Sequence, residues 1–241
     1  MEHHGLPPRD EQPEIPDIVI RRLPIYVRTL KHIDAAGIAT VSSDDLAAQI
    51  GVTAAQIRRD LSYFGKFGKQ GKGYEVATLV AEIQRILNLD REWEVALVGF
   101  GHLGQAIAAY RGFEASSFRI TAIFDRNAER VGQVAERGVR VMAESDISRV
   151  VRENGIRMGI VAVPAGAAQD VTNALIAGGV SAILNYAPVI LRAPENVWIR
   201  DVDPTSAMQS MTYYLAKPAE SPSEIGPNGA VLKAVEAANG Q

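Results

Sequence analysis

The chain has 241 residues, 47% hydrophobic and 22% charged, with a formal net charge of −3, which is ordinary for a globular protein of one large or two modest domains. Because cysteine is absent, the composition excludes disulfides, thiolate metal sites and a thiol-based redox sensor, and it fits the reducing cytoplasm. No apolar run approaches the roughly 18 residues of a membrane span and the N-terminus lacks the apolar stretch of a signal peptide, so we expect a cytoplasmic protein without membrane contact.

Five segments of different character follow one another along the chain. Residues 1–16, rich in proline, glutamate and histidine, and residues 218–241, rich in proline and glycine, are expected to be a disordered and a flexible tail. Residues 17–89 show the apolar period of three to four that is typical of helices. Residues 90–202 alternate short β-branched runs with helical stretches, which predicts a parallel sheet with crossover helices. Residues 203–217 are expected to form one last helix.

Within the helical segment, two short helices joined by a tight turn are predicted. Ser42 caps the first helix, with Asp45 three residues later, and Gly51 ends it. Thr53 caps the second helix, and Gln56 is placed to complete a second capping box. This spacing is that of a helix-turn-helix, whose second helix enters the major groove of DNA.

The second helix and the glycine-rich segment after it concentrate positive charge. Residues 56–75 contain five basic side chains and only two acidic ones, Asp60 and Glu75, so the net charge of this segment is +3. Such a face attracts the phosphate backbone although the whole chain is acidic. The glycines and lysines of residues 65–74 predict a tight wing beside the duplex, and the alternative is a surface helix followed by a solvated loop. The residues expected to contact DNA are Ser43, Thr53, Arg58, Arg59, Ser62, Tyr63, Lys66, Lys69 and Lys72.

A glycine-rich turn follows the first strand of the second half. The apolar run VALV leads into Gly99-Phe100-Gly101-His102-Leu103-Gly104 and then a helix. The pattern GxGxxG between a strand and a helix is the fingerprint of a dinucleotide-binding domain. The first glycine permits the turn, the second lets the backbone approach the pyrophosphate, and the third packs the helix on the sheet. The amides at the helix N-terminus then bind the anion.

The next strand ends at Asp125, about 20 residues past the last glycine. An acid there binds the ribose 2′-hydroxyl of NAD and repels the 2′-phosphate of NADP, although the neighbouring Arg126 weakens the repulsion. We therefore expect NAD(H) as the cofactor, and the alternative is a turn residue in a domain that binds no ligand. Two further strand ends are expected to line the nicotinamide side, each equally consistent with an ordinary turn: Val163, Pro164 and Ala165, and Asn185, Tyr186, Ala187 and Pro188.

A dehydrogenase also needs a group that transfers the substrate proton, and the sequence offers none. The four histidines lie in the N-terminal tail, in the helical half or, as His102, in the glycine loop. No lysine occurs between Lys72 and Lys217. We therefore predict no catalytic residue and no metal site, with the nucleotide as a signal. The alternatives are an NAD-dependent oxidoreductase with an accessory helical domain and a non-catalytic CoA-binding domain.

Several strings of residues resemble the Rex-type redox-sensing repressors of bacteria, over roughly residues 16–217. They are RRLPIYVRTL, IRRDLSYFG, the wing ending in GKGY, VGFGHLG, AAYRGF, VPAGAAQ and ILNYAPVIL. The resemblance implies an α/β protein with an N-terminal winged helix-turn-helix, a Rossmann-type doubly wound parallel sheet and a C-terminal helix that is swapped between subunits. It also implies a homodimer on an inverted-repeat operator in double-stranded DNA. This repressor would be released by NADH and so sense the NADH/NAD⁺ ratio.

The same resemblance implies a switch at the subunit interface. In it, Arg28 and Tyr110 form a polar relay with Asp203 of the partner subunit, and the relay changes partners between the DNA-bound and released forms. Residues 203–217 then belong to the dimer interface. The chain departs from the family pattern at His102, where asparagine or arginine is more usual, and at Pro204, where an apolar side chain is common.

Overall fold

The computed structural model describes residues 15–68 and 72–215. Contacts divide the chain into two units, the first ending at Asp90 and the second beginning at Arg91. Nearly all of both predicted tails, the last two residues of the predicted 203–217 helix and the expected DNA contact Lys69 lie outside the described residues.

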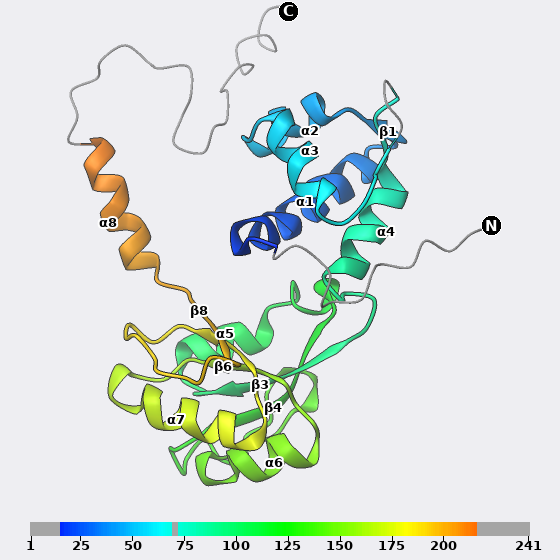
Figure 1. Cartoon of the computed structure of the whole chain (residues 1–241). Coiled ribbons are helices and arrows are strands. Elements are labelled where there is room, and N and C mark those ends of the chain that lie inside the picture. The colour runs from blue at the N-terminus through cyan, green and yellow to red at the C-terminus, as the bar shows by residue number, and fades with distance from the viewer. Residues whose placement is uncertain (1–14, 69–71, 216–241) are drawn as a thin grey trace, which may run out of the picture. The chain divides into compact units, whose positions relative to one another are not determined.

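The described part of the first unit contains helices and a short antiparallel sheet (Figure 1). In chain order the elements are α1 (Asp17–Ala35), β1 (Thr40–Val41), α2 (Ser43–Ile50), α3 (Ala54–Ser62), β2 (Tyr74–Glu75) and α4 (Val76–Ile86). Thr40 pairs with Glu75, so the segment that precedes α2 anchors the end of the wing that follows α3. Wholly buried side chains from all four helices form the core, among them Leu23, Leu30, Leu46, Ile57 and Ile83.

The caps predicted for α2 and α3 are confirmed. The Ser42 hydroxyl accepts a hydrogen bond from the Asp45 N–H at 3.0 Å, and the Thr53 hydroxyl accepts one from the Gln56 N–H at 3.1 Å. Gly51 lies between the two helices with φ 78°, the left-handed conformation that ends α2. The second capping box is only half formed, because the Gln56 side chain extends to Asp60, to which its amide nitrogen donates, rather than back to the N–H of Thr53.

The second unit is built on a six-stranded sheet whose neighbouring strands are all parallel. The strand order is β5-β4-β3-β6-β7-β8, the Rossmann arrangement in which the first strand lies at the centre. The predicted doubly wound parallel sheet is confirmed. In chain order the strands are β3 (Trp93–Val98), β4 (Phe118–Asp125), β5 (Val141–Ala143), β6 (Met158–Val161), β7 (Ala182–Asn185) and β8 (Trp198–Asp201).

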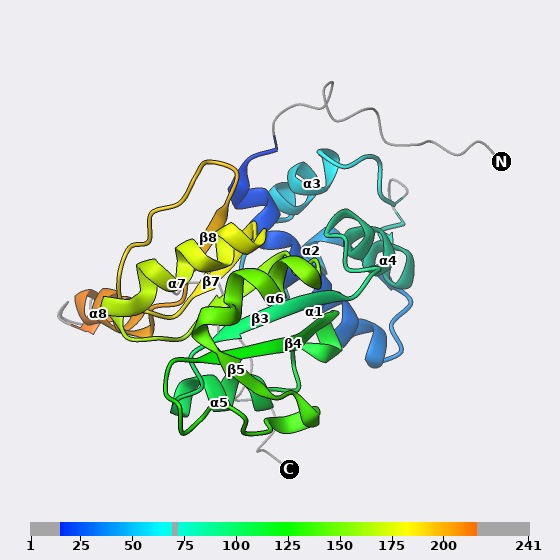
Figure 2. The ribbon, with the colours of Figure 1, turned by 90° about the horizontal axis from the view of Figure 1, so that it is seen from below.

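Helices cover both faces of this sheet. Because successive residues of a strand point to opposite faces, Ala96 and Val98 of β3 pack with α6 and α7, whereas Val95 and Leu97 pack with α5. Figure 2 shows α6 and α7 in front of the strands. The helices are α5 (His102–Ala109), α6 (Ile147–Glu153) and α7 (Ala165–Gly178), with the 3₁₀ turns η2 (Glu114–Ser116), η3 (Glu136–Gly138) and η4 (Glu144–Asp146).

The last described element, α8 (Pro204–Leu215), has no buried residue. Its apolar side chains include Met208, Met211 and Leu215, which are 68%, 61% and 83% exposed. The Asp203 carboxylate begins the helix by accepting hydrogen bonds from the N–H groups of Thr205 and Ser206 at 2.9 and 3.2 Å. None of the described helices combines the length and the hydrophobicity that a membrane crossing requires.

Candidate functional site

A pocket of about 530 Å³ lies at the carboxyl ends of β3, β4 and β6, where open α/β sheets bind their ligands. The residues that line it and that the sequence predicted are Gly99, Gly101, His102, Leu103, Asp125, Arg126, Val163 and Pro164. Those that sequence reasoning missed are Asn127, Arg130, Glu144, Ala162 and Ala167. The pocket therefore joins the glycine turn, the acid after β4 and the end of β6 in one site.

The glycine turn is shaped by backbone contacts that exclude side chains. Gly99 has φ 97°, and a Cβ there would collide with the carbonyl oxygen of Ala162. A Cβ at Gly104 would collide with the carbonyl oxygen of Gly99, so this position packs α5 on the turn. In front of Gly101 the space is open as far as Arg130, 3.8 Å from where a Cβ would lie. Since α5 begins at His102, its first N–H groups fit an anion such as pyrophosphate.

Asp125 is 4% exposed, and its carboxylate holds the glycine turn in place. Oδ2 accepts hydrogen bonds from the N–H of Phe100 at 2.6 Å and from Arg130 at 3.1 Å, and Oδ1 accepts one from the N–H of Asn127 at 2.7 Å. Burial raises the pKa of Asp125, but these hydrogen bonds lower it by more, so the group is ionised at neutral pH. A carboxylate offers about four lone-pair positions, which leaves capacity for a ribose hydroxyl.

Several residues that the sequence predicted for the pocket support the fold around it instead of lining it. Asn185 is buried, and its amide nitrogen donates to the carbonyl oxygens of Ala187 and Val189 and to the Asp201 carboxylate. It therefore fixes the turn after β7. Phe100 packs in the core, Gly104 lies against the turn, and the remaining predicted residues do not line the pocket: Ala165, Tyr186, Ala187 and Pro188.

The first unit presents the basic surface that the sequence predicted. Arg58 and Arg59 are exposed on α3, while Ile57 and Leu61 are buried beneath them. Arg58 donates to the hydroxyl of the buried Ser43 at 2.6 Å, which ties α3 to the start of α2. A hollow of about 710 Å³ lies between α2, α3 and the wing, and the predicted residues that line it are Ser43, Arg58, Ser62 and Lys66. Thr53 caps α3, Tyr63 ends it half-buried, and Lys72 is exposed.

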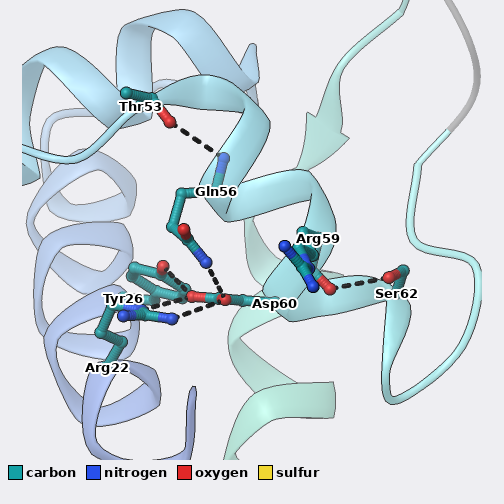
Figure 3. Close-up of polar contacts among 7 residues, drawn as sticks. All are labelled: Arg22, Tyr26, Thr53, Gln56, Arg59, Asp60 and Ser62. Atoms are coloured by element: carbon teal, nitrogen blue, oxygen red, sulfur yellow. Dashed lines mark hydrogen bonds and ion pairs between the residues drawn. The ribbon is translucent and has the colours of Figure 1, made fainter. Parts of the chain in front are cut away.

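One buried carboxylate on α3 was not expected. Asp60 is 0% exposed, so counting it among the charges of the DNA-facing surface was wrong. Arg22 of α1 donates to it through Nε and Nη2 at 2.5 and 2.8 Å, the Tyr26 hydroxyl donates at 2.6 Å and the Gln56 amide at 2.7 Å (Figure 3). These four residues are the Asp60 cluster. Helical spacing offered a signal, because residues 57, 60 and 61 share one helix face.

The charges of the Asp60 cluster stabilise one another. Burial raises the pKa of Asp60, but the hydrogen bonds from Arg22, Tyr26 and Gln56 lower it below its ordinary range. Burial and the neighbouring Asp60 both raise the pKa of Tyr26, so its hydroxyl stays protonated and donates. The cluster is therefore an ionised carboxylate held by three donors at neutral pH.

The three residues of the predicted relay lie on separate elements. Arg28 is exposed on α1, and Tyr110, after α5, packs edge-on against Phe113 with ring centroids 5.3 Å apart. Asp203 begins α8. Arg28 belongs to the first unit and the other two to the second, and the relay stays a prediction. Across residues 15–68 and 72–215, histidines and carboxylates form no group suited to a metal ion.

Comparison with known proteins covers both units. Residues 14–62 match the family model described as "Putative DNA-binding protein N-terminus", and residues 90–189 match the one described as "CoA binding domain". The chain is 52% identical over 212 residues to the "Redox-sensing transcriptional repressor Rex" of Roseiflexus sp. (strain RS-1), covering 88% of this chain and 96% of the relative. The protein of the same description from Desulforamulus reducens is 42% identical over 204 residues, 84% of this chain and 96% of the relative.

Two solved structures of RSP are similar to this chain over most of its length. RSP in complex with β-NAD⁺ and operator DNA has a TM-score of 0.80 and 37% sequence identity, over 84% of this chain and 93% of that chain. RSP in complex with β-NADH has a TM-score of 0.77 and 35% identity, over 84% and 95% of the two chains.

Proposed function

The chain belongs to the Rex family of redox-sensing transcriptional repressors, and from this we propose that it represses transcription by binding operator DNA as a homodimer that NADH releases. The observation that carries the proposal is the presence, in one chain, of a basic helix-turn-helix and a Rossmann pocket with an ionised acid at its ribose end. Its relatives are repressors by description, and we assign the chain no catalytic activity. Its place of action is the cytoplasm, where the operator lies.

The pocket geometry supports NAD(H) as the signal. The open space before Gly101 and the N-terminus of α5 suit the pyrophosphate, and Asp125 suits the ribose hydroxyls. Val163 and Pro164, at the end of β6, then line the nicotinamide side. CoA, suggested by one family model, carries a ribose 3′-phosphate that the ionised Asp125 would repel.

The exposed side chains of α3 and of the wing suit a duplex. In the proposed complex, Arg58 and Arg59 approach the bases or phosphates, and Lys66 and Lys72 bind the backbone. Two recognition helices of a dimer must lie about 34–36 Å apart to enter successive major grooves. The exposed apolar side chains of α8 support an exchange of this helix between subunits.

Release by NADH requires two arrangements of the dimer. NADH can shift the equilibrium between these two arrangements only if it binds one of them more tightly than the other. One arrangement therefore fits DNA, and the other binds NADH more tightly. The relay of Arg28 and Tyr110 with the partner's Asp203 is our proposal for the contacts that change between them.

A nucleotide titration tests this function. The probe is a labelled duplex that the protein itself selects from a random inverted-repeat library, and its anisotropy is followed as NADH, NAD⁺ or CoA is added. We expect NADH to release the duplex at concentrations at which NAD⁺ and CoA do not. DNA binding that is indifferent to all three nucleotides would contradict the proposal, and steady oxidation of NADH by a small carbonyl would favour an oxidoreductase.

A further inference from the structure

We propose that Asp60 is a positioning residue for operator recognition, because it fixes the direction in which α3 presents Arg58 and Arg59 to DNA. This inference rests on the proposed function of the chain. Asp60 itself is wholly buried and touches no DNA; it acts through its two neighbours in the sequence.

The apolar contacts of α3 leave its rotation about its own axis poorly fixed. The helix has nine residues, of which only Ile57, Asp60 and Leu61 are buried. Ile57 and Leu61 contribute hydrophobic contact, which has no preferred direction. Asp60 is the buried side chain whose contacts are directional.

Two elements hold the Asp60 carboxylate. Arg22 and Tyr26 lie one turn apart on α1, and both donate to it, while Gln56 donates from within α3. Arg22 binds both oxygens at once, and such a two-point pairing fixes the carboxylate in the plane of the guanidinium. The direction of residue 60 is therefore set by α1.

Successive side chains of an α-helix leave its axis about 100° apart. Once the direction of Asp60 is fixed, those of Arg59 and Arg58 are fixed as well. Figure 3 shows Asp60 pointing toward Arg22 and Tyr26, and Arg59 takes no part in these contacts. Arg58 has a second support in Ser43. Base contacts depend on the direction of a side chain, whereas attraction to phosphates depends mainly on charge.

Stability alone does not account for the cluster. A buried ion pair can often be replaced by apolar residues of similar volume with little loss of stability, and in some proteins such a pair instead favours one arrangement over others. The pairing of Asp60 with Arg22 therefore contributes chiefly to the orientation of α3.

Three variants test the positioning role. Asp60→Asn removes the charge with almost no change of shape. The double variant Arg22→Met/Asp60→Leu replaces the ion pair with apolar side chains, a change that proteins often tolerate, and so keeps the test open if the single variant does not fold. Asp34→Asn is the matched control, since it removes an equal charge from an exposed position at the end of α1. The affinity of each is measured for the duplex selected by the wild-type protein and for a scrambled duplex of equal length, with NADH binding as a check on the second unit.

We expect Asp60→Asn and the double variant to lower the ratio of the two affinities by about five- to a hundredfold, the discrimination of one base contact. Their affinity for the scrambled duplex should stay within about twofold, and Asp34→Asn should keep the wild-type ratio. An unchanged ratio in a folded Asp60 variant, or an equal loss for both duplexes, would overturn the positioning role alone. A wild-type chain that selects no duplex would contradict the proposed function together with it.

Discussion

Asp60 and Asp125 are two buried carboxylates with lowered pKa values, one in each unit. Asp60 accepts four hydrogen bonds from side chains that close around it, whereas Asp125 accepts three and borders an open pocket. A saturated carboxylate can only hold its neighbours in place. One with spare lone pairs at a pocket can also bind a ligand.

The variant Asp125→Ala should weaken NADH binding about ten- to a hundredfold, since hydrogen bonds to a charged group contribute about 1.5–3 kcal/mol each. Titration calorimetry with NADH measures the effect. Glu129→Ala is the control, because it removes an exposed acid from the same turn and should leave the affinity unchanged. NADH affinity that is equal in both variants would show that Asp125 makes no ribose contact.

Sequence reasoning found the parts of the pocket that depend on short-range spacing. Gly99, Gly101 and Asp125 occupy fixed positions relative to a strand and a helix, so their places could be predicted. Arg130 lies in a connection without periodicity, and its pairing with Asp125 is visible only in three dimensions. Asp60 was misassigned because its partner Arg22 lies 38 residues away in the sequence.

Among the elements, α8 differs from the other described α-helices in having no buried residue. Met208, Met211 and Leu215 follow one another at intervals of three and four residues, so they share one helix face. Exposed apolar side chains in such a row indicate an interface. In the proposed homodimer, a second copy of the chain covers this face.

A charge on that face should therefore weaken the dimer. We expect Met211→Glu to raise the dimer dissociation constant at least about tenfold, because burying an unpaired carboxylate costs several kcal/mol. Sedimentation over a range of protein concentrations measures this constant. Gln209→Glu adds the same charge at a position directed away from Met211 and should have little effect; equal behaviour of both variants would argue against α8 as the interface.

The elements themselves were predictable to different degrees. Caps at Ser42 and Thr53 and the break at Gly51 marked α2 and α3, because hydrogen bonds between near neighbours define them. The strand β5 was missed, since its three residues are too few to show alternation. Glu144, which follows β5 and lines the pocket, was missed with it.

At the scale of the whole molecule, charge is unevenly distributed. The chain carries −3 overall, yet α3 and the wing present arginines and lysines while Asp60 is neutralised internally by Arg22. An acidic protein with a basic face keeps attraction to phosphates local to that face.

The salt dependence of DNA binding reports this attraction. We expect Lys66→Gln/Lys72→Gln to reduce the slope of log affinity against log salt concentration by about two, roughly one for each lost phosphate contact, on any DNA sequence. Arg149→Gln, which removes a charge from α6 in the second unit, should leave the slope unchanged. A slope that the lysine variant does not alter would show that the wing makes no backbone contact.

The glycine turn and Asp125 lie where the pyrophosphate and the adenosine ribose would bind, and this half of the molecule is identical in NAD⁺ and NADH. Affinity contributed here favours neither redox form. With nucleotide well above both dissociation constants, the pocket is saturated, and binding becomes an exchange of one form for the other. Under these conditions the proposed repressor responds to the NADH/NAD⁺ ratio, and a rise or fall of the total nucleotide pool at constant ratio leaves transcription unchanged. The two forms must then be distinguished at the nicotinamide end, which we propose to lie near Val163 and Pro164.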